Sequence, residues 1–231
     1  SAMINNRDIS AIFARAVPPF ALDIPDSRII IVDDNSPDGT GHVARKLCKR
    51  FAPRIDLIER QGKAGLGTAY ICGFTRALES GAKYIGQMDA DLSHSPEQIP
   101  GMLKALQRTD VVVGSRYVSG GDVAKNWGNS RRILSYLANL GIRLIGGLDV
   151  KDVTSGFKIF RSGAVVQLDP RRLHCKGFAF QAEVAFECQR RGLLVIEHPI
   201  VFAERMKGDS KMSFWIALEA LFRLTFLRLR R

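Results

Sequence analysis

Asp89 and Asp91 stand one residue apart directly after an apolar run, and this spacing suits the binding of a divalent cation. Two carboxylates so close together repel each other unless a cation lies between them. Mg²⁺ or Mn²⁺, bound by one or two carboxylates and by substrate phosphates, is the usual solution. Such a cation acts as a Lewis acid on a diphosphate leaving group, so no protein proton donor is needed. An Asp-x-Asp in a loop is often only solvated surface, but its place after an apolar strand favours a metal site.

A second acidic pair, Asp33 and Asp34, ends another apolar run and opens the segment 33–40. Ligands of open α/β sheets bind beyond the carboxyl ends of the strands, so these carboxylates can accept hydrogen bonds from a ribose or a base. A turn with a helix cap would explain residues 35–40, but not two acids at a strand end. The pair therefore favours nucleotide binding.

Two further segments have weaker patterns. The glycine-rich stretch 61–67 lacks the Gly-Lys-Ser/Thr ending of a P-loop and the spacing of a dinucleotide fingerprint, so a flexible turn and a nucleotide contact both remain open. His94 lies in a loop between two serines, where we expect a polar surface residue without a catalytic role.

These residues must be positioned by alternating strands and helices. Apolar runs predict strands at 28–32, 55–58, 84–88 and 111–113, with helices at 40–51, 68–80 and 96–107 between them. Ser95 before Pro96 suits a helix N-cap, and Gly81 suits a helix stop. The later half predicts helices at 130–145 and 178–191 and strands at 157–160 and 193–202. This rhythm indicates an α/β fold, a Rossmann-like, mostly parallel sheet flanked by helices.

The two ends differ from that rhythm. A domain of this kind normally opens with a strand, yet residues 5–17 look helical, so we expect the first strand to be missing from the sequence. Residues 213–231 predict an amphipathic helix with four arginines, too charged to span a bilayer and suited to an interfacial or juxtamembrane position. We therefore expect one catalytic domain at 1–212 followed by this helix.

Composition restricts the partner and the compartment. Lys and Arg number 34 against 23 Asp and Glu, a net charge of +11, which favours an anionic partner such as a nucleic acid, a phosphorylated molecule or a membrane surface. The four cysteines are far apart and form no CxxC pair, which argues against a disulfide framework and a zinc site and indicates a reducing compartment.

Six segments, taken in order, resemble the dolichyl- or polyprenyl-phosphate mannose synthases, which are GT-A glycosyltransferases of family 2. The resemblance covers residues 28–213 and rests on 31–40 (IVDDNSPDGT), 65–67 (GLG), 88–94 (MDADLSH), 114–117 (GSRY), 154–157 (TSGF) and 205–212 (RMKGDSKM). It implies inverting transfer of mannose from GDP-mannose to a dolichyl or polyprenyl monophosphate, with Mg²⁺ or Mn²⁺. It also implies that the protein acts at the cytoplasmic face of a membrane, either as a peripheral protein or anchored by helices beyond this sequence. No nucleic-acid partner is expected.

The resemblance also assigns site residues. Asp89, Asp91, Arg116 and Arg131 would be catalytic, and Asp91 and Asp89 would bind the metal. The donor would contact Val32, Asp34, Asp89, Ala90, Asp91, Lys176, Arg205, Ser210 and Lys211, and the acceptor phosphate would contact Arg116, Arg131 and Lys211. Ser93 stands where some relatives have a metal-binding glutamine, which leaves the third ligand open, and Arg132 is expected on a solvated face.

A polyprenyl monophosphate carries ~1.5 to 2 negative charges at neutral pH, so its oxygen is already a nucleophile and no general base is needed. The nearest alternative is a polyprenyl-phosphate glucosyltransferase that uses a UDP-sugar. A basic module that binds RNA or anionic lipid without catalysis is a different class. It predicts aromatic residues interleaved with the cations, whereas only 8% of the residues are aromatic and the acids cluster at strand ends.

Overall fold

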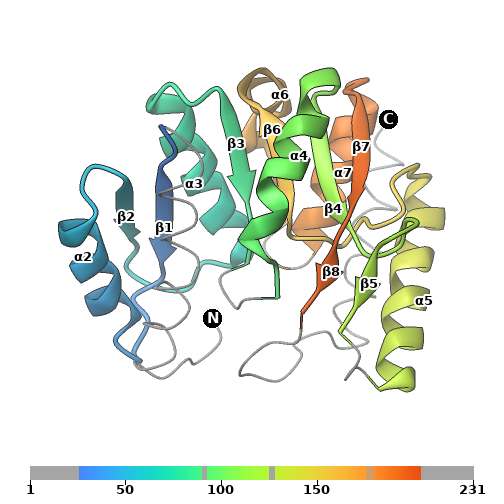
Figure 1. The fold of residues 1–231 in the computed structure, drawn as a ribbon, viewed down its shortest axis with the longest axis horizontal. Helices are drawn as coiled ribbons and strands as arrows, with labels where there is room; N and C mark the ends of the chain where they lie inside the picture. Colours follow the sequence, from blue (N-terminus) through green and yellow to red (C-terminus); the bar gives the residue numbers. More distant parts are fainter. Residues whose placement is uncertain (1–25, 90–92, 125–127, 176, 178, 204–231) are drawn as a thin grey trace.

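The computed structural model describes residues 26–89, 93–124, 128–175, 177 and 179–203. The first half alternates strands and helices: β1 (Ile29–Asp33), α2 (Thr40–Arg50), β2 (Ile55–Glu59), α3 (Leu66–Glu79), β3 (Tyr84–Gln87), α4 (Ile99–Ala105) and β4 (Val111–Ser115). The second half contains β5 (Asp122–Val123), α5 (Asn129–Gly146), β6 (Lys158–Arg161), α6 (Ser162–Leu168), α7 (Ala179–Arg190), β7 (Val195–Pro199) and β8 (Val201–Phe202). Figure 1 shows these elements as one α/β arrangement, which confirms the predicted fold class.

The predicted elements match the observed ones closely in the first half and less closely later. The helix expected at 96–107 is α4 with a 3₁₀ turn at each end, Pro96–Gln98 and Leu106–Arg108. Ser95 is the N-cap residue and Pro96 follows at the start of the helical segment, as predicted, but the Ser95 hydroxyl donates to Glu97 and makes no cap bond to the main chain. Gly81 has φ +72 just after α3, as a helix stop requires. The strand expected at 193–202 is divided into β7 and β8.

The sheet order explains how distant segments reach one edge. β3, β6, β4 and β7 form one sheet in that order, and β6 runs antiparallel to both β3 and β4. β1 pairs with β2, and β5 with β8, both in parallel. The start of the antiparallel β6 therefore lies at the same edge as the carboxyl ends of β3 and β4, which places segment 152–157 beside the ends of those two strands.

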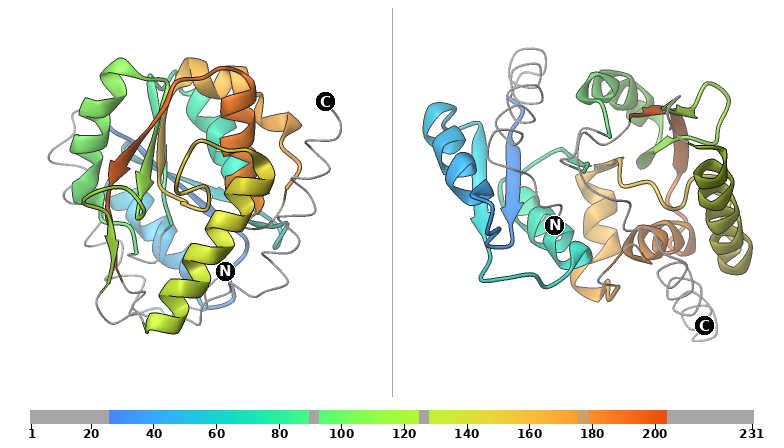
Figure 2. Two further views of the ribbon diagram at one scale, coloured as in Figure 1. Left: turned by 90° about the vertical axis from the view of Figure 1, so that its right-hand side faces the viewer. Right: turned by 90° about the horizontal axis from the view of Figure 1, so that it is seen from below.

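Helices cover both faces of the central sheet, and β4 shows why its sequence is continuously apolar. Val111 and Val113 pack into the larger core cluster with residues of α3, α6 and α7, whereas Val112 packs into the smaller cluster with residues of α4. Alternate residues of a strand point to opposite faces, so a strand that is covered on both sides needs apolar residues at every position. Figure 2 shows the two helical layers with the sheet between them.

Within the described ranges, no helix is long and apolar enough to cross a membrane. The helices expected at 5–17 and 213–231 lie outside the described residues.

Candidate active site

The candidate site is built where β1, β3 and β4 end. β1 ends at Asp33 with Asp34 next, β3 is followed by Met88 and Asp89, and β4 is followed by Arg116. In open α/β sheets this edge is the usual place for a ligand. The structure therefore puts the predicted acidic pair and the first metal-binding aspartate after strands of the same fold, as the sequence indicated.

Asp89 is a partly exposed carboxylate held in a defined position. Its Oδ1 accepts a 2.8 Å hydrogen bond from the Tyr70 hydroxyl, and its main-chain N–H donates to His94 Nδ1 at 3.2 Å. Gly156 lies directly against it, because a Cβ at position 156 would be 3.1 Å from both carboxylate oxygens. A side chain at 156 would thus displace Asp89, which explains why this position carries glycine.

Asp89, the described member of the predicted metal-binding pair, has the chemistry that a hard divalent cation requires. Among the described residues Asp89 enters no ion pair, although Arg and Lys side chains are numerous. A partly exposed carboxylate is a suitable oxygen ligand for Mg²⁺ or Mn²⁺. The described residues contain no group of three metal-ligating side chains, and Asp91, with Ala90, lies outside them. Ser93 is fully buried and its main-chain oxygen accepts from Ala203 at 2.9 Å.

The acidic pair at the end of β1 has two different environments. Asp33 is buried and accepts the Ser36 N–H, which shapes the turn after the strand. Asp34 is held by Arg60, whose Nε donates to it at 2.6 Å. The Arg60 guanidinium also donates to the Thr68 hydroxyl at 2.7 Å, so one arginine connects the end of β1 to the start of α3. Val32 lies in β1 with its side chain near Gly73 of α3.

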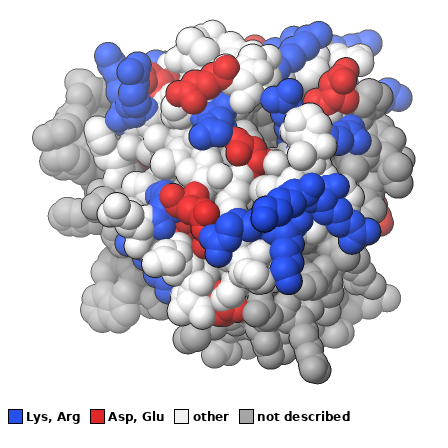
Figure 3. Space-filling model, turned by 90° about the vertical axis from the view of Figure 1, so that its left-hand side faces the viewer, with Lys and Arg blue, Asp and Glu red and all other residues white. Residues whose placement is uncertain are grey.

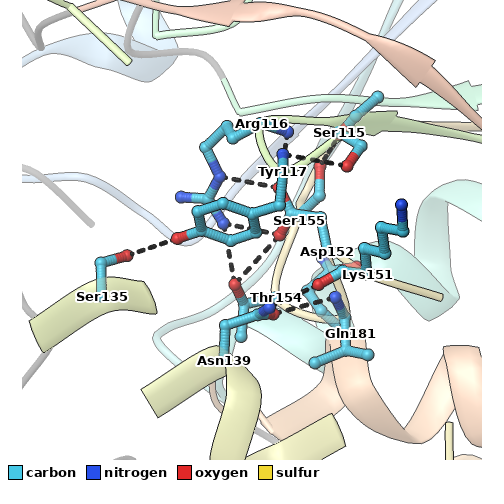
Figure 4. Close-up of polar contacts among 12 residues, drawn as sticks. Ser115, Arg116, Tyr117, Ser135, Asn139, Lys151, Asp152, Thr154, Ser155 and Gln181 are labelled. Atoms are coloured by element: carbon cyan, nitrogen blue, oxygen red, sulfur yellow. Dashed lines mark hydrogen bonds and ion pairs between the residues drawn. The ribbon is translucent and has the colours of Figure 1, made fainter. Parts of the chain in front are cut away.

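Arg116 is held by a buried fork of hydrogen bonds. Its Nε and Nη2 donate to the two oxygens of Asp152 at 2.8 and 2.7 Å, and Nη2 also donates to the Thr154 hydroxyl at 2.8 Å. The Asp152 side chain has no exposed surface. Figure 4 shows this arrangement, in which the third guanidinium nitrogen points away from Asp152. Among the described residues, no hydrogen bond uses that nitrogen, Nη1.

Burial and ion pairing shift the pKa values of Arg116 and Asp152 in opposite directions. Burial alone would lower the pKa of Arg116, but the charge and hydrogen bonds of Asp152 outweigh it, and the pKa rises above the ordinary arginine value. Burial would raise the pKa of Asp152, yet the charge and hydrogen bonds of Arg116 hold it below the usual range. Both groups are therefore charged at neutral pH.

Segment 151–153 is fixed from both sides. Glu197 of β7 accepts the main-chain N–H groups of Lys151 and Asp152 at 2.8 and 2.9 Å. Asn139 of α5 bonds the Lys151 carbonyl and accepts the Val153 N–H at 3.0 Å. The carboxylate that orients Arg116 is thus attached to β7 and to α5.

Beneath Gly156 lies a buried polar network. Lys158 donates to the Ser155 carbonyl and to Gln181 Oε1, and Gln87 donates to that same oxygen at 2.7 Å and to the Gly156 carbonyl at 3.2 Å. Burial lowers the pKa of Lys158 to about 8 against the opposing charge of Asp152. These hydrogen bonds fix the main chain at Ser155 and Gly156, beside the Asp89 carboxylate.

One sequence expectation needs revision, and one glycine has a packing role that the sequence did not indicate. His94 is 1% exposed and packs against the rings of Phe157 and Phe202, so the expectation of polar surface is wrong. In the glycine-rich stretch, a Cβ at Gly67 would lie 2.1 Å from the Cys175 carbonyl oxygen, so this glycine lets α3 approach segment 174–177 closely. That is a packing requirement, which neither a flexible turn nor a nucleotide contact had suggested.

The basic surplus is distributed more widely than one cleft. Figure 3 shows Lys and Arg side chains running across the face that α2 covers, where Arg45, Lys46, Lys49 and Arg50 are exposed. The side chain of Arg132 is 37% exposed, and it also donates to the Val123 carbonyl of β5 at 2.8 Å. Six predicted site residues lie outside the described part of the chain: Ala90, Asp91, Lys176, Arg205, Ser210 and Lys211. The side chain of Arg131 is not described either.

Sequence reasoning missed the residues that orient the predicted ones: Arg60, Tyr70, Asp152 and Glu197. Asp152 had one usable signal, since it lies two residues before the 154–157 motif. The others lie in segments without a motif, and only the fold brings them to the site.

The architecture is that of the GT-A glycosyltransferases. Solved structures similar to this one include glucosyl-3-phosphoglycerate synthase from Mycobacterium tuberculosis with Mn²⁺, UDP-glucose and glycerol 3-phosphate, at a TM-score of 0.61 and 15% identity over 98% of this chain and 76% of that chain. Another is a mannosyltransferase from Pyrobaculum calidifontis with GDP-mannose and Mn²⁺, at 0.59 and 15% identity over 99% of this chain and 62% of that chain.

Sequence similarity is more specific. The family model described as glycosyl transferase family 2 matches residues 12–168, so the chain belongs to this family of glycosyltransferases. It is 41% identical over 202 residues, 87% of this chain and 82% of the relative, to an undecaprenyl-phosphate mannosyltransferase of Micrococcus luteus. It is 39% identical over 201 residues, 87% of this chain and 76% of the relative, to a polyprenol monophosphomannose synthase of Mycolicibacterium smegmatis.

Proposed function

We propose that this glycosyltransferase transfers mannose from GDP-mannose to a polyprenyl or dolichyl monophosphate, with inversion at the sugar carbon. The observation that carries the proposal is identity near 40% to two relatives with such names, over most of their length and most of this chain. The Asp89 site at the sheet edge agrees with it, because a diphosphate donor needs carboxylates and a cation at that place.

On the donor side, Asp34 would accept hydrogen bonds from the nucleoside, and Asp89 with Asp91 would hold Mg²⁺ or Mn²⁺ beside the diphosphate. The cation, when bound, supplies charge neutralisation for the leaving nucleoside diphosphate. Val32, Ala90 and Lys176 would complete the donor contacts, with Arg205, Ser210 and Lys211 closing over the phosphates. The pairing of Asp34 with Arg60 holds its carboxylate in a fixed position.

On the acceptor side, Arg116 would bind the lipid phosphate together with Arg131 and Lys211. The structure supports a defined role for Arg116, because two of its nitrogens are held by Asp152 and Thr154, while Nη1 points away from them. A guanidinium that is oriented in this way presents its charge in one direction and loses little entropy on binding an anion. The phosphate oxygen then attacks without a general base, because it is already ionised.

A membrane surface is the second partner we propose. α5 lies at one edge of the molecule (Figures 1 and 2), and Ile133, Leu134, Leu137 and Leu144 on it are each more than half exposed. Their spacing places Ile133, Leu137 and Leu144 on one side of the helix. An apolar helix face beside the proposed acceptor site suits contact with the bilayer in which a polyprenyl tail resides.

The proposed function is tested by a donor panel with a short polyprenyl phosphate. GDP-mannose, GDP-glucose, UDP-glucose and UDP-galactose are each supplied with Mn²⁺, and the lipid product is quantified. We expect GDP-mannose to give the highest kcat/KM. Preferential use of UDP-glucose would instead support the glucosyltransferase alternative, and no lipid-linked product from any donor would contradict both.

A further inference from the structure

The hydrogen bond from Tyr70 to Asp89 joins a helix to the proposed metal ligand. Tyr70 lies in the first half of α3, whereas Asp89 follows β3, and the hydroxyl reaches Oδ1 at 2.8 Å. A carboxylate on a loop can rotate about its side-chain bonds, and one charge-assisted hydrogen bond selects an orientation. The carboxylate also lies beside Gly156, where an added Cβ would be 3.1 Å from both of its oxygens, so residues from two segments distant in sequence surround it.

The ring of Tyr70 is itself held by an aromatic stack. It lies nearly parallel to Phe180, with the ring centroids 5.6 Å apart and the planes at 9°, and it also contacts Phe74 at 6.4 Å. Phe180 is fully buried in the first turn of α7. Because Phe180 is fully buried, the stack restricts how far the partly buried Tyr70 ring can turn, and with it the position of the hydroxyl.

The same stack is connected to residues on both sides of the proposed donor contact Lys176 in the sequence. Phe180 N–H donates to the Gly177 carbonyl at 3.1 Å. The buried Glu183, also in α7, accepts the main-chain N–H groups of His174 and Cys175 at 3.0 and 2.8 Å. Residues 174, 175 and 177, together with the Asp89 carboxylate, are therefore attached to one unit formed by α3 and α7.

We propose that Tyr70 is a positioning residue of this site, whose hydroxyl orients Asp89 for the divalent cation and whose ring keeps that orientation aligned with residues 174, 175 and 177. This inference rests on the proposed metal-dependent transfer. Partners that orient a metal ligand through a hydrogen bond typically contribute ~10- to 100-fold to metal affinity. The hydroxyl and the ring have separable tasks, so different substitutions should change different constants.

The test compares Tyr70→Phe, which keeps the ring and removes the hydroxyl, with Tyr84→Phe as the matched control. Tyr84 lies in β3, five residues before Asp89, and its ring contacts Lys83. Mn²⁺ binding is titrated by electron paramagnetic resonance in the presence of GDP. We expect the Kd for Mn²⁺ to rise about 10-fold in Tyr70→Phe, at the lower limit for such partners, and to stay unchanged in Tyr84→Phe.

Two further readouts separate positioning from a purely structural role. In EDTA, Tyr70→Phe should unfold at the wild-type temperature. In separate activity assays with Mn²⁺, its KM for polyprenyl phosphate should be unchanged, while its Mn²⁺ activation constant rises. Phe180→Leu, which keeps the hydroxyl and removes the stack, should raise the KM for GDP-mannose as well.

The outcomes distinguish this inference from the proposed function. A wild-type protein that binds Mn²⁺ and GDP, together with a Tyr70→Phe variant that binds them equally well, would overturn the role of Tyr70 alone. A Tyr70→Phe variant with a lowered unfolding temperature in EDTA and an unchanged Kd would assign Tyr70 to stability and also overturn it. A wild-type protein that binds no Mn²⁺ in the presence of GDP would contradict the metal-dependent reaction and, with it, this role.

Discussion

Replacing Asp152 by asparagine should strongly destabilise the protein, because it leaves the Arg116 charge buried without its counterion. Asp152 is fully buried and accepts bonds from Nε, Nη2 and the main-chain N–H of Arg116. Asparagine has nearly the same shape, so the change removes charge and acceptor strength rather than volume. A buried ion pair that loses one partner typically costs about 3 to 5 kcal/mol.

The assay is equilibrium urea unfolding followed by circular dichroism. With an m-value of about 3 kcal/mol per molar urea for a chain of this size, the expected loss moves the midpoint down by roughly 1 to 2 M. The matched control is Asp169→Asn, since Asp169 forms ion pairs with Arg171 and Arg172 that are largely exposed. Its midpoint should stay where the wild type has it, because exposed pairs contribute little.

A double variant tests the reasoning more closely. Arg116→Gln combined with Asp152→Asn removes both charges, so its loss should be smaller than the sum of the two single losses by more than ~1 kcal/mol. A loss below ~1 kcal/mol for Asp152→Asn alone, or additive losses in the double variant, would refute the claim that this pair is mutually dependent.

The contribution of Asp152 to the free energy of unfolding should decrease as the pH falls. The pKa of Asp152 is lowered in the folded protein, so its contribution is complete above the unfolded-state value of ~3.9 and is lost as the pH falls through the folded value. The difference in unfolding free energy between wild type and Asp152→Asn should therefore be constant near neutral pH and shrink below about pH 4.

Three more outcomes are expected. Gly67→Ala should destabilise by about 1 to 3 kcal/mol and raise the KM for the donor, because its Cβ would lie 2.1 Å from the Cys175 oxygen. Gly73→Ala in the same helix should be neutral or stabilising in urea unfolding, since its nearest neighbour is 3.8 Å away; equal effects would contradict the close-approach argument. Asp91→Asn, or EDTA on the wild type, should abolish transfer in a lipid-product assay with the fold intact, and undiminished activity in EDTA would refute the metal assignment. Leu137→Glu with Leu144→Glu should reduce co-sedimentation with liposomes, whereas the exposed Val166→Glu on α6 should not; equal sedimentation would show that α5 is not the membrane contact.

The local elements were predictable because a strand that is covered by helices on both faces needs an uninterrupted apolar run in the sequence. The uninterrupted apolar runs at β1 and β4 predict strands buried on both faces. The packing of Val111 and Val112 into opposite clusters confirms this for β4, whereas the apolar residues of β1 are only partly buried. The acidic residues directly after β1 and β3 were placed correctly at the sheet edge for the same reason, since a strand and the residues that follow it are neighbours in sequence.

The supporting contacts were not predictable, because they depend on register between distant strands. Arg116 and Asp152 meet only because β6 runs antiparallel between β3 and β4, which a pattern typical of parallel sheets does not suggest. His94 looked like a surface residue since its loop is polar, and its burial comes from Phe157 and Phe202 on other segments. Tyr70 has the spacing of an ordinary core aromatic in α3, and its hydroxyl acquires a role only where β3 ends beside it.

The central claim is that the carboxylate site at the sheet edge transfers mannose to a lipid phosphate with inversion. The most direct measurement is nuclear magnetic resonance of the product formed from GDP-mannose and a short polyprenyl phosphate with Mn²⁺, by the wild type and by Asp89→Asn. We predict a β-linked mannosyl phosphate from the wild type and none from Asp89→Asn. An α-linked product, or β-linked product formed as fast by Asp89→Asn as by the wild type, would contradict the account.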